Sequence, residues 1–382
     1  MKICRSFAFD VVLEEDDICN LINDRKILQE VVKLGHRLVF FGRRKTGKTS
    51  LLKSIIIPYF AERRSKGLSM YVDLMNVSSE EDVCRRMTAA LEASYARSKP
   101  SQKFLNGLVS LAKSVRPQFS IDSLSGVPTF SFGLEGSYRT LSLEQLFTQI
   151  ALYHKEVGAL IIIDEFQDIS EIDTLPARMR SVMQNLPSDL PVIISGSKKH
   201  ILSKMFADPK APFSSWGRHH EIGAISVDDY LLYANERFEP FGISFPVEAC
   251  EYLMKRMNRI PEPMNMVCDR LTRISKNGPR KEIQMEDIEA AISLIIEERS
   301  PLFIERITRF TEKEQRFLKV LSDLQIIALP TGKLFLRATG LSAGGCSAIL
   351  NRLEDQTMIY REPDGYILGD PLLAEYLRLK VR

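Results

Sequence analysis

The sequence lacks the arrangements of cysteine and histidine that build metal sites or disulfide frameworks. Its 382 residues include six cysteines and five histidines, and no two cysteines form a C-x-x-C pair. No histidine stands beside a cysteine at the spacing of zinc ligands. His219 and His220 are adjacent, whereas a helical metal pair is four residues apart. These absences exclude a zinc finger and a disulfide scaffold, and they predict reduced, mostly buried thiols in a cytoplasmic protein.

The chain also lacks a long apolar run and a strong net charge. Its longest strongly apolar run, Ala159 to Ile163, is far too short to span a bilayer. The N-terminus continues into the acidic residues 14–17 without the apolar segment of a signal peptide. The formal net charge is only +3, so no overall basic field indicates nucleic acid binding. We therefore expect neither export nor a membrane partner, and any DNA contact must come from a local patch.

A phosphate-binding loop is the strongest motif that is present. Residues 42–49 read Gly-Arg-Arg-Lys-Thr-Gly-Lys-Thr and fit the pattern G-x-x-x-x-G-K-[ST]. The flanking sequence predicts a short buried strand at 37–41 and a helix at 50–56, which is the context that the motif requires. Glycines let the backbone wrap around a polyphosphate, and the helix presents its positive N-terminal end. An ordinary basic turn is the less favoured alternative.

Each residue type in this loop has an expected task. Lys48 is expected to reach the β- and γ-phosphates of ATP, and the Thr49 hydroxyl to coordinate Mg²⁺. The predicted nucleotide-binding residues are Gly42, Arg43, Arg44, Lys45, Thr46, Gly47, Lys48, Thr49 and Ser50.

Two carboxylates follow a second buried strand. The apolar run from Gly158 to Ile163 ends in Asp164 and Glu165. In a parallel sheet such a strand delivers its acids at the carboxyl edge, where ligands bind. We expect Asp164 to hold Mg²⁺ through water and Glu165 to polarise the attacking water. Such an acid pair is often only a solvated strand end, but the loop upstream favours the catalytic interpretation.

The next predicted strand, residues 190–197, ends in small hydroxyl side chains. Ser195 or Ser197 is placed to sense the γ-phosphate, and an ordinary strand-to-loop turn fits the same residues nearly as well. We retain Ser197 as a predicted nucleotide-binding residue.

The alternation of strands and helices predicts an α/β protein with three parts. A P-loop ATPase core with a parallel sheet is expected at 1–225, with a β-hairpin inserted at about 117–136. Helical apolar spacing predicts a helical lid at 226–300. Three helices and a strand pair predict a C-terminal winged helix-turn-helix domain at 301–382.

The winged helix has an ambiguous partner. Its presumed recognition helix, Ala343 to Arg352, carries one basic residue, whereas groove binding normally needs several contacts. DNA binding and protein docking through residues 301–382 therefore both remain open.

Taken together, the chain resembles the archaeal-type ATPase family, a branch of P-loop ATPases close to AAA+ and STAND proteins. The resemblance covers nearly the full length, with Lys45 in place of the second arginine of the family loop. One departure is that the usual G-x-P of the lid appears only as Ile260-Pro261-Glu262-Pro263. The matching elements are Gly42 to Leu51 for the phosphate loop, Ile163 to Gln167 for I-D-E-x-Q, Ser195 to Ser197 for S-G-S, Trp216 to Arg218 for Y-G-R, and Asp370 to Tyr376 for the terminal D-P motif.

The resemblance implies ATP hydrolysis or ATP switching with ATP, ADP and Mg²⁺. It also assigns Arg218 as a catalytic residue that supplies positive charge to the γ-phosphate, from its own chain or from a neighbour in a homo-oligomer. The plain alternative is an arginine paired with a surface acid.

Two functions therefore stand side by side. The first is an Mg²⁺-dependent ATPase that acts on DNA or a DNA-associated partner through the winged helix. The second is a slow-turnover signalling switch that uses the winged helix for protein contacts. A transcription factor with a degenerate nucleotide site is disfavoured, because Lys48, Thr49, Asp164 and Glu165 are all present.

Overall fold

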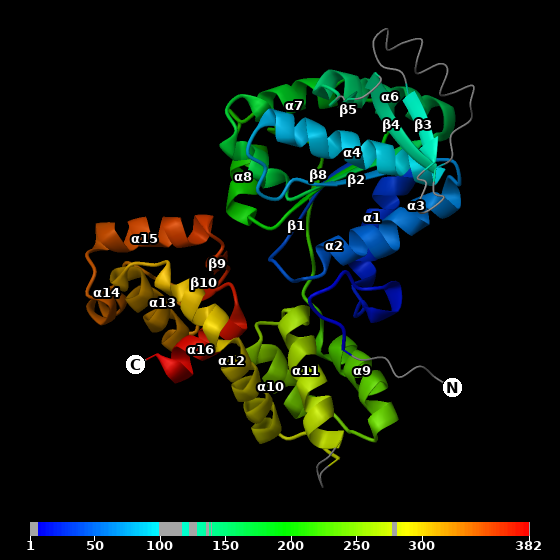
Figure 1. Ribbon diagram of the computed structural model, residues 1–382. Coiled ribbons are helices and arrows are strands. Elements are labelled where there is room, and N and C mark those ends of the chain that lie inside the picture. The colour runs from blue at the N-terminus through cyan, green and yellow to red at the C-terminus, as the bar shows by residue number, and fades with distance from the viewer. Residues whose placement is uncertain are drawn as a thin grey trace. The chain divides into compact units, whose positions relative to one another are not determined.

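The computed structural model of the protein describes residues 7–98, 117–121, 128–134, 137–138, 140–276 and 281–381 (Figure 1). The chain forms two compact units. The sheet unit comprises Ile22–Gly42 and Lys48–Ile222, and the helical unit comprises residues up to Leu21, the loop Arg43–Gly47, and Gly223–Arg382.

A five-stranded parallel sheet organises the sheet unit. The strand order is β2-β6-β7-β1-β8, and every neighbouring pair is parallel. All five carboxyl ends therefore lie at one edge, as predicted for a P-loop core. The strands are β1 (Arg37–Phe41), β2 (Leu68–Asp73), β6 (Ala159–Asp164), β7 (Val192–Gly196) and β8 (Arg218–Glu221).

Helices cover both faces because the central strands are apolar on both sides. All six residues of β6 are buried, which is typical of a strand inside a parallel sheet. Alternate residues of the strands pack with α4, α6, α7 and α8 in one continuous core, and Figure 1 shows α4 and α6 side by side. The helices are α1 (Ile22–Leu34), α2 (Lys48–Ser50), η2 (Leu51–Ile56), α3 (Ile57–Arg63), α4 (Glu80–Ser98), α6 (Leu143–Val157), η3 (Phe166–Glu171), α7 (Leu175–Met183) and α8 (Lys199–Ala207).

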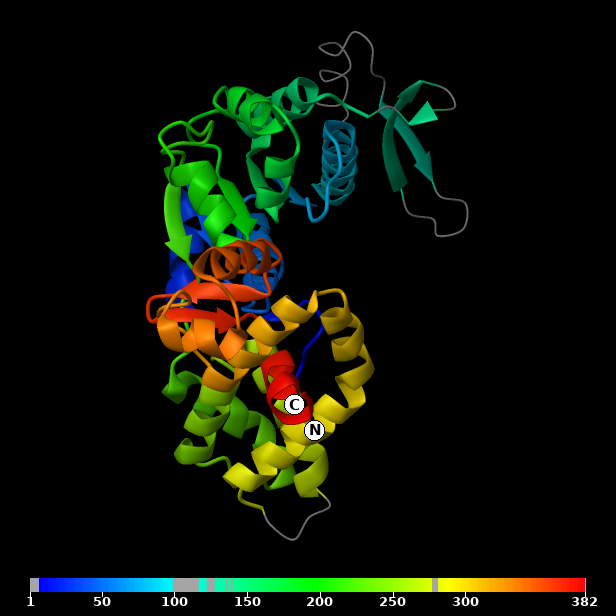
Figure 2. The same cartoon turned by 90° about the vertical axis from the view of Figure 1, so that its left-hand side faces the viewer.

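The predicted inserted hairpin is present. Strand β3 (Pro117–Ile121) pairs antiparallel with β4 (Pro128–Leu134), and β4 pairs with the short β5 (Ser137–Tyr138) (Figure 2). The connecting residues 122–127 lie outside the described residues.

The helical unit begins with a row of helices. These are η1 (Glu15–Asp17), α9 (Val227–Phe238), η4 (Glu239–Phe241), α10 (Val247–Arg256), α11 (Pro261–Lys276) and α12 (Met285–Thr308). The border that the sequence predicted at residues 300 and 301 falls inside α12, because that helix continues through Pro301. A proline is therefore accommodated here within a helix that it would normally end.

The C-terminal part has the order of a winged helix. Three helices precede an antiparallel strand pair, and a last helix packs behind them. The first helix begins with a capping box in which Thr311 and Glu314 satisfy each other's backbone N–H groups. The elements are α13 (Glu312–Leu324), α14 (Lys333–Thr339), α15 (Ala343–Asp355), β9 (Ile359–Glu362), β10 (Gly365–Leu368) and α16 (Pro371–Lys380).

The cysteines within the described part of the chain are free thiols, and all five are buried, as the sequence predicted: Cys19, Cys84, Cys250, Cys268 and Cys346. Cys4 lies outside the described residues. No helix in the described residues is both long enough and apolar enough to cross a membrane.

Candidate nucleotide-binding site

The phosphate loop joins the carboxyl end of β1 to α2. Gly47 has φ +96°, a conformation that side chains rarely adopt, so glycine is required where the loop turns into the helix. Lys48 is buried, and its Nζ donates to the carbonyl oxygen of Gly42 at 2.8 Å. Thr46 Oγ1 donates to the carbonyl oxygen of Arg43 at 2.8 Å. The loop is thus closed on itself by two side chains of its own motif.

The two residues predicted to hold Mg²⁺ meet at the sheet edge. Thr49 Oγ1 donates to Asp164 Oδ2 at 2.8 Å, and Asp164 is 2% exposed. One hydroxyl and one carboxylate suit Mg²⁺, which usually keeps several waters and takes further oxygens from nucleotide phosphates. This donor set therefore fits a metal that binds together with its nucleotide.

Tyr71 is a site residue that the sequence analysis missed. Its hydroxyl donates to the same Asp164 Oδ2 at 2.7 Å, and Lys53 Nζ lies 4.4 Å from the centre of its ring. Burial raises the pKa of Tyr71, and the negative charge of Asp164 raises it further, so the hydroxyl keeps its proton and remains a donor. Asp164 is thereby fixed by donors from two different elements.

Glu165 is held from two sides. Its backbone is left-handed with φ +51°, and its half-buried carboxylate accepts hydrogen bonds at Oε2 from Ser197 Oγ at 2.8 Å and from Gln167 Nε2. Of the two predicted serines, Ser197 thus contacts the acid predicted to act on water. The hydroxyl of Ser195 is buried within β7 and has no hydrogen-bond partner among the described residues.

A network around Asp168 holds Gln167, which in turn contacts Glu165. Asp168 accepts from Gln167 Nε2 and forms an ion pair with Lys198 Nζ, both at 3.1 Å. Its other oxygen accepts from the backbone N–H of Asn76 at 2.8 Å. The ends of three strands are therefore tied to Gln167, which in turn orients Glu165. The sequence placed Gln167 in a motif but gave no sign of the roles of Asp168 and Lys198.

Arg218 stands at the other edge of the sheet. It opens β8 opposite Leu38, whereas the phosphate loop begins after Phe41. Three residues of strand, about 10 Å, separate these levels. The Arg218 side chain is 52% exposed and its Nη1 lies 3.5 Å from Glu30 Oε1. The Arg218 backbone thus lies at a different level from the phosphate loop, and its action on a γ-phosphate, from its own chain or from a neighbour, stays a prediction.

The middle of the phosphate loop has protein partners within the helical unit. Arg43 Nη1 lies 3.4 Å from Glu362 Oε1, and its guanidinium stands over the ring of Tyr360. Burial lowers the pKa of Arg43. Lys45 Nζ lies 2.7 Å from Glu262 Oε1, in the segment where the lid departs from the family pattern. A direct role for Arg43 and Lys45 at the nucleotide stays a prediction.

Comparison with known proteins shows the fold. No family model and no curated protein sequence matches the chain. The Walker-type ATPase of Pyrococcus abyssi is 19% identical with a TM-score of 0.65, covering 98% of this chain and 99% of that one. The ORC2 protein of Aeropyrum pernix, solved in ADPNP and ADP complexes, is 12% identical with a TM-score of 0.58, covering 97% and 96%. The chain therefore has the fold of an archaeal P-loop ATPase over nearly its whole length, and the predicted fold class is confirmed.

Proposed function

We propose that this protein is an Mg²⁺-dependent ATPase that couples its nucleotide state to a partner through the winged helix. The observation that carries the proposal is the 2.8 Å contact between Thr49 and Asp164 at the end of a closed phosphate loop. Glu165 follows Asp164 directly, and its carboxylate is oriented by Ser197 and Gln167. The fold is similar to that of a Walker-type ATPase and of a protein solved with ADPNP and ADP, which supports nucleotide binding.

The residues have separable tasks in this proposal. Backbone N–H groups of the loop and the Lys48 ammonium group bind the phosphates. To do so, Lys48 gives up its hydrogen bond to the carbonyl oxygen of Gly42. Thr49, and Asp164 through water, would hold Mg²⁺, which would supply positive charge to the phosphate oxygens. Glu165 accepts a hydrogen bond from the attacking water and takes up its proton. Ser197 and Gln167 keep that carboxylate oriented toward the water.

The binding part is tested by Lys48→Ala. Removing the main cation that faces the phosphates should weaken ATP affinity at least about a hundredfold in isothermal calorimetry. Lys204→Ala is the matched control, because Lys204 is an exposed lysine on α8, a helix that begins beyond the loop after β7. Equal ATP affinity of a folded Lys48→Ala protein and the wild type would refute the site.

The surface of the winged helix favours a protein partner over bare DNA. On α15 the exposed residues Ala343, Gly344, Ser347 and Ala348 are uncharged. The single basic residue, Arg352, lies 3.0 Å from the buried carboxylate of Glu314. Such a helix offers few phosphate contacts.

Exposed leucines on neighbouring segments support the same choice. Leu329 is 73% exposed, Leu334 is 86% exposed and Leu324 is 54% exposed. A contiguous apolar patch marks a surface that another protein covers, and these three leucines are candidates for such a patch. We infer a protein partner, which fits both a DNA-associated client and the alternative of a slow switch.

Binding and turnover measurements separate these functions. We expect weak binding of duplex DNA, without the steep loss between low and moderate salt that several phosphate contacts produce, and with little change on adding ATP. A steep salt dependence whose slope falls by about one phosphate contact in Arg352→Ala would instead show direct DNA binding. Multiple-turnover kinetics then distinguish a cycling ATPase from a switch that hydrolyses once and holds ADP.

A further inference from the structure

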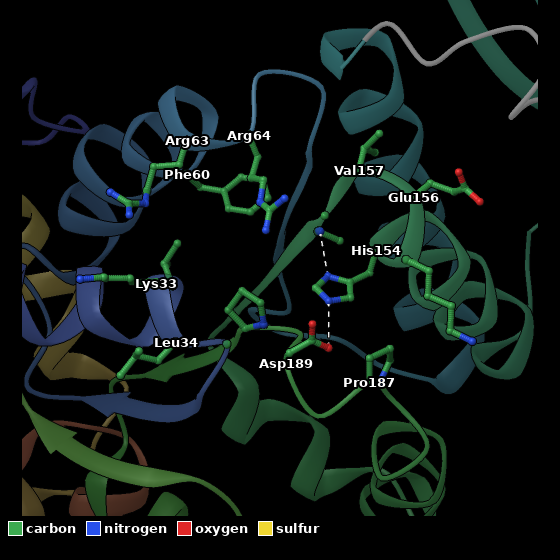
Figure 3. Close-up of a pocket in the computed structure, with 16 residues that line it drawn as sticks. Lys33, Leu34, Phe60, Arg63, Arg64, His154, Glu156, Val157, Pro187 and Asp189 are labelled. Atoms are coloured by element: carbon green, nitrogen blue, oxygen red, sulfur yellow. Dashed lines mark hydrogen bonds and ion pairs between the residues drawn. The ribbon is translucent and has the colours of Figure 1, made fainter.

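A cavity lies at the amino edge of the sheet, whereas the phosphate loop follows the carboxyl end of β1 (Figure 3). Its volume is about 750 Å³, within the range of sites that bind ligands. Its walls are the segments that lead from helices into strands: the end of α1, the end of α3, the end of α6 and the residues before β7. Because the strands are parallel, this cavity is separate from the nucleotide site.

Backbone contacts fix these walls. Gly35 has φ +71°, and a Cβ added there would stand 2.1 Å from the carbonyl oxygen of Asp189. The N–H of Leu68 donates to Gly158 at 3.0 Å, and that of Ile161 donates to Pro191 at 3.1 Å. The hollow is therefore a built feature of the fold, whose shape does not depend on exposed side chains alone.

Four cations surround the opening. Lys33, Arg63, Arg64 and Lys155 are all exposed. None of the four forms an ion pair with a described carboxylate. Figure 3 shows Arg64 extending toward the wall that carries His154, whereas the neighbouring Arg63 points to the other side. Arg63 stands over the ring of Tyr59, 5.2 Å from its centre, and exposed cations without an ion pair are available to an anionic ligand.

Two acids, Glu156 and Asp189, line the cavity against the four cations, so a positive charge remains. The Nδ1 atom of His154 accepts the backbone N–H of Ala159 at 3.1 Å, so the ring proton is on Nε2. That Nε2 lies 3.2 Å from Asp189 Oδ1, which orients this carboxylate and leaves its negative charge in place. In Figure 3 the carboxylate of Glu156 points away from the other labelled side chains.

More positive charge stands nearby on the same edge. Arg37 opens β1 and donates from Nη2 to the carbonyl oxygen of Leu186 at 3.3 Å. Its pKa is lowered by burial and also by the positive charge of Arg180. Two further arginines close enough to repel each other therefore add to the field at this edge.

The cavity also has an apolar wall, which decides the class of ligand. Leu34 is 49% exposed at the opening, and Phe60, Val157, Pro187 and Pro191 line the hollow. A nucleic acid backbone gains from cations but has no apolar group to place against Leu34. Phe60 is only 4% exposed, so it offers no face on which a base can stack. A protein segment with both acidic and apolar side chains uses both parts of the surface.

We propose that this cavity binds an acidic segment of a partner protein. An apolar side chain of the segment lies against Leu34 and Pro187, and its carboxylates pair with Arg63, Arg64 and Lys155. Arginine forks suit this task because a guanidinium binds a carboxylate with two parallel hydrogen bonds. The site is independent of the proposed ATPase function, since it uses none of the nucleotide-site residues.

Fluorescence anisotropy with short synthetic peptides tests the proposal. The probe is a labelled peptide in which leucine alternates with pairs of glutamate. Its controls are a peptide with lysine for glutamate, one with serine for leucine, and a labelled single-stranded oligonucleotide. We expect the acidic leucine peptide to bind the full-length protein most tightly, with affinity that falls as salt rises.

Substitutions locate the binding. The double variant Arg64→Glu/Lys155→Glu should weaken the acidic leucine peptide at least about tenfold. Leu34→Ser should weaken it to a smaller degree and remove the preference for leucine over serine. The matched controls are Lys204→Glu and Met75→Ser, since Lys204 is an exposed cation and Met75 is an exposed apolar side chain of the same unit. Unchanged ATP affinity of every variant shows that each is folded and that the nucleotide site is intact.

Three results would overturn the proposal. The first is tighter binding of the oligonucleotide than of the peptide, with loss in the same double variant, because the edge would then be a nucleic acid surface. The second is equal peptide affinity in the double variant and in Lys204→Glu. The third is absence of binding by the acidic leucine peptide at low salt.

Discussion

Glu165 occupies a backbone conformation that is unfavourable for its side chain. A φ of +51° costs a residue other than glycine about 1 to 3 kcal/mol, and such strain persists only where the surroundings hold it. Here Ser197 and Gln167 both donate to one carboxylate oxygen, and Asp168, which pairs with Lys198, accepts a hydrogen bond from Gln167. We infer that this strained backbone lowers the stability of the protein and in return orients the Glu165 carboxylate.

Glu165→Gln should separate binding from hydrolysis. The amide keeps the size of the side chain but cannot take a proton from water, so steady-state ATP turnover should fall about a hundredfold or more while ATP affinity changes little. A phosphate-release assay and calorimetry on the same preparation measure both quantities. Glu171→Gln is the control, because Glu171 is an exposed acid at the end of the same short helix. Turnover within a few-fold of the wild type would reduce Glu165 to a strand-end acid.

The sequence predicts the site residues that belong to a motif, and it misses those that meet only when the chain folds. The sequence predicts that Thr49 and Asp164 share a metal site, because each motif follows the carboxyl end of its own strand. Tyr71 was missed because its role depends on β2 being the neighbour of β6, and no local pattern encodes strand order. Asp168 and Lys198 were missed for the same reason.

At the scale of elements, short connections between helices and strands set the shape of the amino edge. The turn after α1 passes so close to Asp189 that only glycine fits at position 35. The sequence predicts the helix and the strand on either side of this turn from their apolar spacing. It does not predict the contact, because Gly35 and Asp189 are far apart along the chain.

Gly35→Ala should destabilise the protein more than an ordinary glycine substitution. The matched control is Gly242→Ala, since Gly242 has a similar φ of +65° but nothing within 4 Å of the added methyl group. We expect the free energy of unfolding to fall by about 1 to 3 kcal/mol more for Gly35→Ala than for the control, because its methyl group overlaps backbone. Urea unfolding measures the difference. Equal losses would show that the turn moves aside at no cost.

The chain folds into two units, and one of them combines stretches that are far apart in the sequence. The loop Arg43–Gly47 and the residues up to Leu21 group with the helical unit, although both lie within the predicted core of residues 1–225. Periodicity describes continuous segments, so it cannot show that a unit is assembled from three separate stretches. The predicted domain limits remain predictions, and α12 runs through one of them.

Arg218 is predicted to act on the γ-phosphate of its own chain or of a neighbouring chain in an oligomer. We expect Arg218→Ala to lower ATP turnover at least about tenfold with nearly unchanged ATP affinity. Mixing Arg218→Ala with Lys48→Ala should restore part of the turnover, since an intact arginine then faces an intact loop. Glu30→Gln is the control, because it breaks the same ion pair but leaves the arginine. Normal turnover of Arg218→Ala would leave Arg218 as an exposed ion pair worth about 0 to 1 kcal/mol.

The buried cysteines can report local unfolding of each unit, because a thiol reagent reaches them only when their surroundings open. Burial raises the pKa of Cys84 to about 11 and that of Cys250 to about 12, so both are unreactive thiols at neutral pH while their surroundings are closed. Cys84 lies in the sheet unit, whereas Cys250 and Cys346 lie in the helical unit. The order in which a thiol reagent labels them, read by mass spectrometry, therefore records which unit opens first, and adding ATP shows which opening the nucleotide suppresses.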